Sequence, residues 1–133
     1  MTAPIRLTIP RDRRYHGVAR LVLGGLAARL ELSYEHLEDL QLALSTILED
    51  KSYVTDEEVT VELHVVDDVL SVRIGPLDGE RVRRDLETES GERIGLGRLL
   101  RTVVEHVEIE SGEGGEWVRL EKRVKSVKAA ESK

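Results

Sequence analysis

The stretch GERIGLGRLL, residues 91–100, contains the residues of this chain that are best suited to binding chemistry. Gly91, Gly95 and Gly97 surround the start of an apolar run that begins at Leu96 and has helical spacing. Glycines let the backbone N–H groups at a helix start approach an anion closely, and several nucleotide-binding folds hold phosphates in this way. A tight turn into a helix, with no ligand, needs the same residues. Both interpretations stay open.

Other polar residues give weaker signals. The four histidines fall in different expected elements and no two are spaced i, i+4, which argues against a metal site. The serines lack the local sequence of a nucleophile elbow. Acidic side chains gather along residues 35–50, where a solvated helix face is the ordinary interpretation and paired-carboxylate catalysis is the alternative.

Arginines near the N-terminus form a local reversal of charge. Arg11, Arg13 and Arg14 lie close together in a chain whose formal net charge is −6. Such a basic patch can steer an acidic partner toward the surface. The arginines at 81–84 allow the same interpretation, or that of ordinary solvated loop charges.

Composition excludes several classes of function. A length of 133 residues, 40% hydrophobic and 35% charged, is typical of one globular domain. The negative net charge and the 3% of aromatic residues argue against direct DNA binding, which favours basic and stacking side chains. No stretch approaches the roughly 20 apolar residues that cross a bilayer, and no signal peptide is expected. The absence of cysteine fits a reducing compartment, so we expect a cytoplasmic protein without membrane partners.

The first half of the chain predicts four elements. Residues 5–10 alternate apolar and polar side chains as a half-buried strand does. Residues 15–30 have helical spacing. Ser33 is a good N-cap for a second helix, and residues 59–74 alternate on both sides of Asp67-Asp68, which predicts a hairpin. The apolar residues expected to mark the buried face of the first helix are Val18, Leu21, Val22, Leu26 and Leu30.

The second half predicts a loop, a helix and another hairpin. Residues 75–95 are polar, charged and rich in glycine, so a long loop is expected there. A third helix is expected from Leu96 to Glu105, followed by a hairpin around 112–115. Residues 1–124 would form the single domain and residues 125–133 a disordered tail. The order predicts an α+β fold: a two-layer sandwich of three helices on one face of a mostly antiparallel, mixed sheet.

This ordered set of motifs resembles the anti-sigma-factor serine-protein kinase family (RsbW-like), from about Ile5 to Val124. IRLTIP followed by VARLVLGGLAARLELSYEHLEDLQLALSTI is similar to the family's first strand and first two helices. GLGRLLRTVVEHVEIES resembles its second glycine box, and GEGGEWVRLEKRV resembles its closing hairpin. The resemblance implies the ATPase fold of histidine kinases and gyrase.

The resemblance also implies where catalytic residues should lie. Active members carry a Glu on the second helix as general base, and an Asn four residues later that holds magnesium. These positions are Thr46 and Asp50 in this chain. Thr46 has no group that takes a proton at neutral pH, so no catalytic residue is assigned. Asp50 is an oxygen ligand that would hold Mg²⁺ only if ATP binds, because its charge repels a triphosphate.

Two further requirements concern nucleotide recognition. The Asp that accepts from the adenine amino group in the family is replaced here by Arg73 or Ile74, neither of which can accept that hydrogen bond. Gly75, Gly95 and Gly97 match the glycines that approach the phosphates. Three of the four requirements are therefore absent or altered, which predicts that ATP binding and kinase activity are lost and that no cofactor is used.

The resemblance finally implies a partner surface. Arg20 matches an Arg that the family uses where sigma factor and anti-anti-sigma protein compete, and Arg13 and Arg14 would extend that surface. The expected function is an anti-sigma-type regulator that binds either partner or both, and that dimerises as family members do. The alternative is an active serine kinase that uses Mg-ATP through Asp50, Gly75, Gly95 and Gly97. A scaffolding role in a larger complex is a third possibility.

Overall fold

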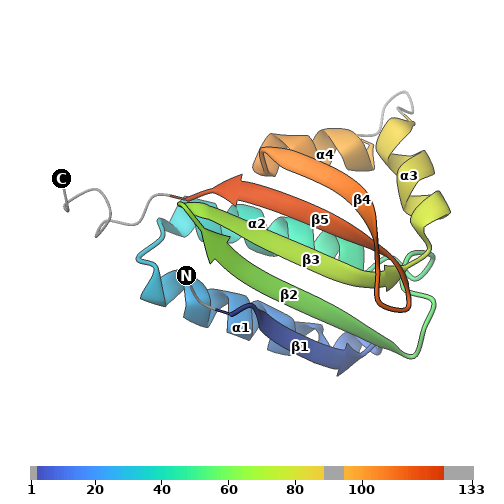
Figure 1. Cartoon of the computed structure of the whole chain (residues 1–133), viewed down its shortest axis with the longest axis horizontal. Helices are drawn as coiled ribbons and strands as arrows, with labels where there is room; N and C mark the ends of the chain where they lie inside the picture. Colours follow the sequence, from blue (N-terminus) through green and yellow to red (C-terminus); the bar gives the residue numbers. More distant parts are fainter. Residues whose placement is uncertain (1–2, 89–94, 125–133) are drawn as a thin grey trace.

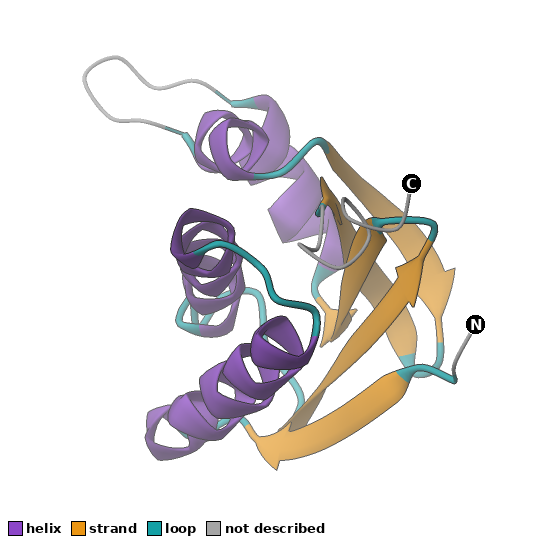
Figure 2. Ribbon diagram, turned by 90° about the vertical axis from the view of Figure 1, so that its left-hand side faces the viewer, coloured by secondary structure: helices purple, strands orange, loops and turns teal. Residues whose placement is uncertain are grey.

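The computed structural model describes residues 3–88 and 95–124. The tail predicted for residues 125–133 lies outside the described residues. Figure 1 shows the described part as one twisted sheet with helices packed along it, and Figure 2 shows that the helices all lie on one side of the sheet. This is the predicted α+β arrangement of two layers.

Within residues 3–88 and 95–124 the sheet has five strands, in the order β1-β2-β3-β5-β4. Every described neighbouring pair is antiparallel. The mixed sheet of the prediction is therefore wrong in this detail. β3 and β4 run in the same direction, but β5 lies between them, so no parallel pair is hydrogen-bonded. The strands are β1 (Ile5–Pro10), β2 (Glu58–Val66), β3 (Val69–Leu77), β4 (His106–Gly112) and β5 (Gly115–Arg123).

Both predicted hairpins are present. β2 turns into β3 at Asp67 and Asp68, which have φ angles of 50° and 63°. Positive φ at both central residues is the geometry of a two-residue hairpin turn, and Asp tolerates it because its short polar side chain is compatible with the left-handed region. β4 and β5 are joined through Gly114, whose φ is 82°. The alternating patterns and their turn residues were thus sufficient to predict these strands.

In the described part of the chain four helices cover the sheet, one more than predicted. They are α1 (His16–Arg29), α2 (Tyr34–Leu48), α3 (Gly79–Glu87) and α4 (Leu96–Val103), and a 3-10 turn over Arg13–Tyr15 precedes α1. Ser33 caps α2 as expected, since its hydroxyl accepts a hydrogen bond of 3.1 Å from the backbone N–H of His36. Among the described residues, no helix is both long enough and apolar enough to span a bilayer.

The additional helix, α3, lies inside the long loop expected over residues 75–95, so that prediction is wrong for this part; residues 89–94 are outside the described residues. Asp78 caps α3 by accepting from the backbone N–H of Arg81 at 3.1 Å. Val82 is fully buried and Leu86 packs against the core one turn later. With only two apolar residues among its nine, the helix has too short a hydrophobic pattern to be recognised in the sequence.

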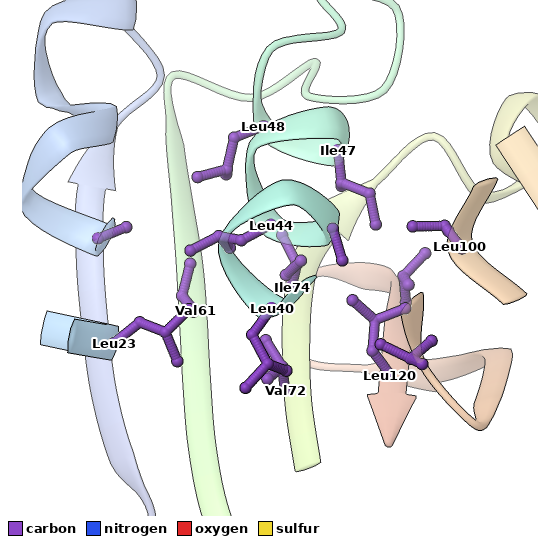
Figure 3. Packing of buried hydrophobic residues seen from close by; sticks show 14 of the residues in the cluster. Leu23, Leu40, Leu44, Ile47, Leu48, Val61, Val72, Ile74, Leu100 and Leu120 are labelled. Carbon is purple, nitrogen blue, oxygen red and sulfur yellow. The ribbon is translucent and has the colours of Figure 1, made fainter. Parts of the chain in front are cut away.

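The core lies between the helices and the sheet. Figure 3 shows Leu44 and Ile47 of α2 pointing toward Ile74 on β3 and Leu100 on α4, and Leu23 of α1 pointing toward β2. All five of these side chains have no solvent exposure. Removing a buried side chain such as Leu44 by substitution with Ala costs about 2–5 kcal/mol. Helix α2 contacts both α1 and α4 and therefore joins the helical layer above the core.

The face of α1 that is buried differs from the predicted one. Its buried residues are His16, Ala19, Leu23 and Ala27. Leu21, expected on the buried face, is 77% exposed, and Val18 is 40% exposed. The small side chains of Ala19 and Ala27 let α1 approach its neighbours closely, while Val22 and Leu26 of the predicted face are partly buried and pack against the core.

Candidate functional site

The residues expected to bind nucleotide lie near the end of the sheet where β3 ends. The C-terminal end of α2 and the start of α3 lie in this region, and the N-terminal end of α4 lies beside the other end of α3 (Figure 1). A hydrogen bond of 2.8 Å from the backbone N–H of Asp78 to the carbonyl of Tyr53 ties the segment after α2 to the end of β3. Helices α3 and α4 pack against each other, and α2 contacts α4.

Thr46 and Asp50 are both engaged within their own segment. The hydroxyl of Thr46 donates to the carbonyl of Leu42 one turn earlier, at 2.7 Å. A carboxylate oxygen of Asp50 accepts from the backbone N–H of Ser52 at 2.8 Å and also contacts the Ser52 hydroxyl. This arrangement is an Asx turn that ends α2 and leads the chain toward β2. Both side chains thus form hydrogen bonds with backbone groups of nearby residues.

Arg73 and Ile74, the two candidates for the position that binds adenine in the family, lie on opposite faces of β3. Ile74 is fully buried under the helices. Arg73 points to the opposite face, where its guanidinium bonds Glu62 and Glu110, each at 2.6 Å, and lies 4.6 Å from the centroid of the Trp117 ring. Desolvation lowers the pKa of Arg73, but the hydrogen bonds that its guanidinium donates to the two carboxylates outweigh this effect and raise the pKa overall. The residue on the helix side is therefore Ile74, which has no hydrogen-bonding group.

Close packing of the chain against itself explains two of the three expected phosphate-binding glycines without a ligand. A Cβ at Gly75 would overlap the Trp117 ring, and a Cβ at Gly97 would overlap the carbonyl oxygen of Leu86 at the end of α3. Arg101 donates to that same carbonyl at 3.2 Å. Gly95 is the N-cap residue of α4, and its carbonyl accepts from Leu99 at 3.0 Å. Close approach of the chain to itself requires small residues at two of the three positions.

Sequence reasoning missed Tyr53, which lies in a segment expected to be a polar connection. Its side chain is 3% exposed, and its hydroxyl donates to the carboxylate of Asp85 on α3 at 2.6 Å. Burial raises the pKa of Tyr53, and the bond to Asp85 raises it further. A single aromatic residue among polar neighbours was the only signal in the sequence. The contact fixes α3 beside the end of α2.

The expected partner surface lies elsewhere, along α1 and α2. Arg20 is half-buried, and its guanidinium is 3.5 Å from the hydroxyl of Ser45 on α2. Gln41 donates to the backbone carbonyl of Arg20 at 3.4 Å. Beside them, Leu21 is 77% exposed and Leu42 is 45% exposed. An arginine held by a neighbouring helix and flanked by exposed apolar side chains has the composition of an interaction hot spot.

Arg13 and Arg14 lie on the 3-10 turn directly before α1, and both are exposed. Arg14 pairs with Asp12 at 3.0 Å and lies over the ring of Tyr15 at 5.9 Å. The hydrogen bond from Arg14 lowers the pKa of Asp12. The positive patch is therefore weaker than its sequence implied, because one of its charges is balanced by a neighbour.

No group of three or more His, Asp or Glu side chains in residues 3–88 and 95–124 is arranged to hold a metal ion. Asp50, the residue expected to hold Mg²⁺ together with ATP, therefore belongs to no such group of described residues. Three surface pockets in the described part of the chain are lined by other residues than Thr46, Asp50 and the three glycines.

Comparisons with known proteins agree with this arrangement, although no protein-family model matches the chain. A serine-protein kinase RsbW from Bacillus pumilus is 30% identical over 129 residues, which covers 83% of this chain and 80% of the relative. One from Listeria innocua is 36% identical over 93 residues, and the match spans 57% of that relative. In a crystal structure of the RsbU and RsbW domains of a Mycobacterium tuberculosis protein, 32% of that chain matches 92% of this one with a TM-score of 0.68 and 19% identity.

The structural match shows that this chain has the same α+β fold as part of a solved structure that contains RsbU and RsbW domains. Sequence identity over most of both chains goes further. The chain belongs to the RsbW-like family of anti-sigma-factor serine-protein kinases.

Proposed function

We propose that this chain is an anti-sigma-type regulator that acts through protein contacts and has lost ATP binding and kinase activity. In this proposal residues 1–124 act as one domain in the cytoplasm. It binds a sigma factor, an anti-anti-sigma protein, or both in competition, and it dimerises. Family membership supports the partner class, and the contacts of the residues at the expected nucleotide positions support the loss of chemistry.

One observation carries the loss of nucleotide binding: Ile74 stands, fully buried, on the helix side of β3 where the family needs an acceptor for adenine. An adenine amino group brought there would lose its hydrogen bond to water without gaining another. Leaving such a buried polar group unpaired costs about 1–3 kcal/mol. The hydroxyl of Thr46, which stands for the catalytic Glu, is bonded to its own helix and has no basicity for proton abstraction.

Thermal unfolding with and without millimolar Mg-ATP tests this part. A ligand at 100 times its dissociation constant stabilises a protein by about 2.7 kcal/mol, which raises Tm by several degrees. We expect no rise, and no transfer of labelled phosphate to an anti-anti-sigma substrate. Transfer that depends on Asp50 would instead establish the active kinase, with Asp50→Ala as the variant that removes it.

The partner surface is tested separately, because it does not depend on nucleotide. Arg20→Glu should weaken binding of the cognate sigma factor or anti-anti-sigma domain by about 2 kcal/mol or more, roughly 30-fold, if Arg20 is a hot spot. Arg29→Glu, at the other end of the same helix and exposed, is the matched control and should leave the affinity unchanged. Calorimetry against each candidate partner measures both. Equal affinities for the two variants would place the interface elsewhere, and sedimentation of the free chain measures the dimer.

A further inference from the structure

One of the surface pockets lies at the N-terminal end of α1, where the segments 11–16 and 48–54 face each other. Its volume is about 590 Å³. The polar residues that line it are Arg11, Asp12, Arg13, His16, Glu49 and Lys51. Asp50 lies between two of these residues in the sequence, but its carboxylate is turned into the bond with Ser52. The pocket therefore shares no lining residue with the expected nucleotide positions.

The charge of this pocket is positive. Arg13 and Lys51 are exposed and have no ion-pair partner among the residues that the structure describes. Arg11 is held in place by a bond of 3.1 Å from its guanidinium to the carbonyl of Thr55. Of the two carboxylates, Asp12 is paired with Arg14 at 3.0 Å, so its charge is already compensated. Three cations thus face one uncompensated carboxylate.

A buried imidazole adds a polar group without a partner. His16, the first residue of α1, is 4% exposed and lines the pocket. Its Nδ1 atom is buried and has no hydrogen-bond partner in the described part of the chain. Leaving a buried polar atom unsatisfied costs about 1–3 kcal/mol, and such atoms are rare unless a ligand or ion completes them. A hydrogen-bonding ligand in the pocket would compensate this cost after a small adjustment of the ring.

We infer that this pocket binds a small phosphate-class oxyanion, either inorganic phosphate or a phosphate monoester. A dianion with several acceptor oxygens can be bound by guanidinium, ammonium and imidazole groups from different directions at once. A monocarboxylate carries half that charge and two acceptors. Among the described residues, no group of His, Asp and Glu side chains is arranged to hold a metal ion beside this pocket.

Titration of the ¹⁵N-labelled chain with inorganic phosphate at constant ionic strength tests the inference. Saturable shifts are expected in the His16 ring and in the amides of Arg13 and Lys51, and not in His106 on β4. Arg13→Gln and Lys51→Gln should each raise the dissociation constant about threefold or more. Glu49→Gln should lower it, since it removes the repelling carboxylate, and Arg29→Gln is the matched control without effect.

Further arms identify the ligand. Acetate should bind at least tenfold more weakly than phosphate, and comparison of phosphate with phosphoserine distinguishes a free ion from a monoester. Chemical shifts that fail to saturate with phosphate would overturn the inference. Equal dissociation constants in all four variants would also overturn it. The same variants separate this pocket from the nucleotide positions: a rise of Tm with Mg-ATP that Arg13→Gln removes comes from the pocket, and one that survives this substitution comes from the end of α4.

Discussion

Two regions of this molecule, to which the proposed function assigns different roles, differ in how their side chains are engaged. At the end of β3, the positions that serve nucleotide in the family now carry side chains that bond their own backbone or pack in the core, as Thr46, Asp50 and Ile74 do. Along α1 and α2, Arg20 and Leu21 remain available on the surface. Under the proposed function, this difference means that the fold keeps a recognition surface while packing replaces the chemistry beside it.

The strongest test of this comparison restores the family's carboxylate. Ile74→Asp should lower the free energy of unfolding by about 3–5 kcal/mol, because an unpaired charge would be buried among the apolar side chains of the core. Urea denaturation measures the change. Ile74→Val is the control for lost volume and should cost about 0.5–1.5 kcal/mol. A mild effect of Ile74→Asp together with gain of Mg-ATP binding would show that the nucleotide site is still open.

The next test concerns the glycines. Gly97→Ala should destabilise the chain by about 1–3 kcal/mol, since the new methyl group meets the backbone carbonyl of Leu86. Gly25→Ala, inside α1 with nothing within 4 Å, should stabilise it by about 0.5–1 kcal/mol. Both are measured by thermal unfolding without any ligand. If Gly97→Ala were as well tolerated as Gly25→Ala, packing would not explain this glycine and a phosphate role would become the better account.

Tyr53 gives a smaller effect with a distinctive pH dependence. Tyr53→Phe should cost about 1 kcal/mol at pH 7, because the hydrogen bond to Asp85 is lost. Burial and Asp85 raise the pKa of Tyr53 in the folded state, so its contribution is complete below the unfolded pKa of about 10 and is lost as pH rises above it. The gap in stability between wild type and Tyr53→Phe should therefore narrow as pH rises from about 10 toward the raised pKa of the folded state. A constant gap would contradict the buried bond.

The smallest effect on stability is expected on the open surface. Leu21→Ser should change the free energy of unfolding by no more than about 0.5 kcal/mol, because the side chain is 77% exposed. The same substitution should weaken partner binding about tenfold if Leu21 is buried in the complex. Chemical denaturation and calorimetry on one preparation measure the two quantities. A large loss of stability would mean that Leu21 belongs to the core of the domain.

Much of the fold was predictable from local patterns. The strands 5–10 and 59–74 and the capped helix after Ser33 follow from alternation, period and turn residues, which act between near neighbours in sequence. Helix α3 was missed because only Val82 and Leu86 mark its buried face. The exposure of Leu21 was missed for a related reason: a helix with apolar residues on two sides does not show which side its neighbours will cover.

The sequence by itself determined which chemical groups are present at the expected nucleotide positions, and so it predicted that Thr46 stands at the position of a base and that residues 73 and 74 carry no acceptor. Only the tertiary structure decided that Ile74, and not Arg73, faces the helices, because strand pairing fixes which residues point to which face. It also decided what Gly75 and Gly97 approach and that Tyr53 meets Asp85. These contacts join residues more than ten positions apart, and no local pattern specifies such distances.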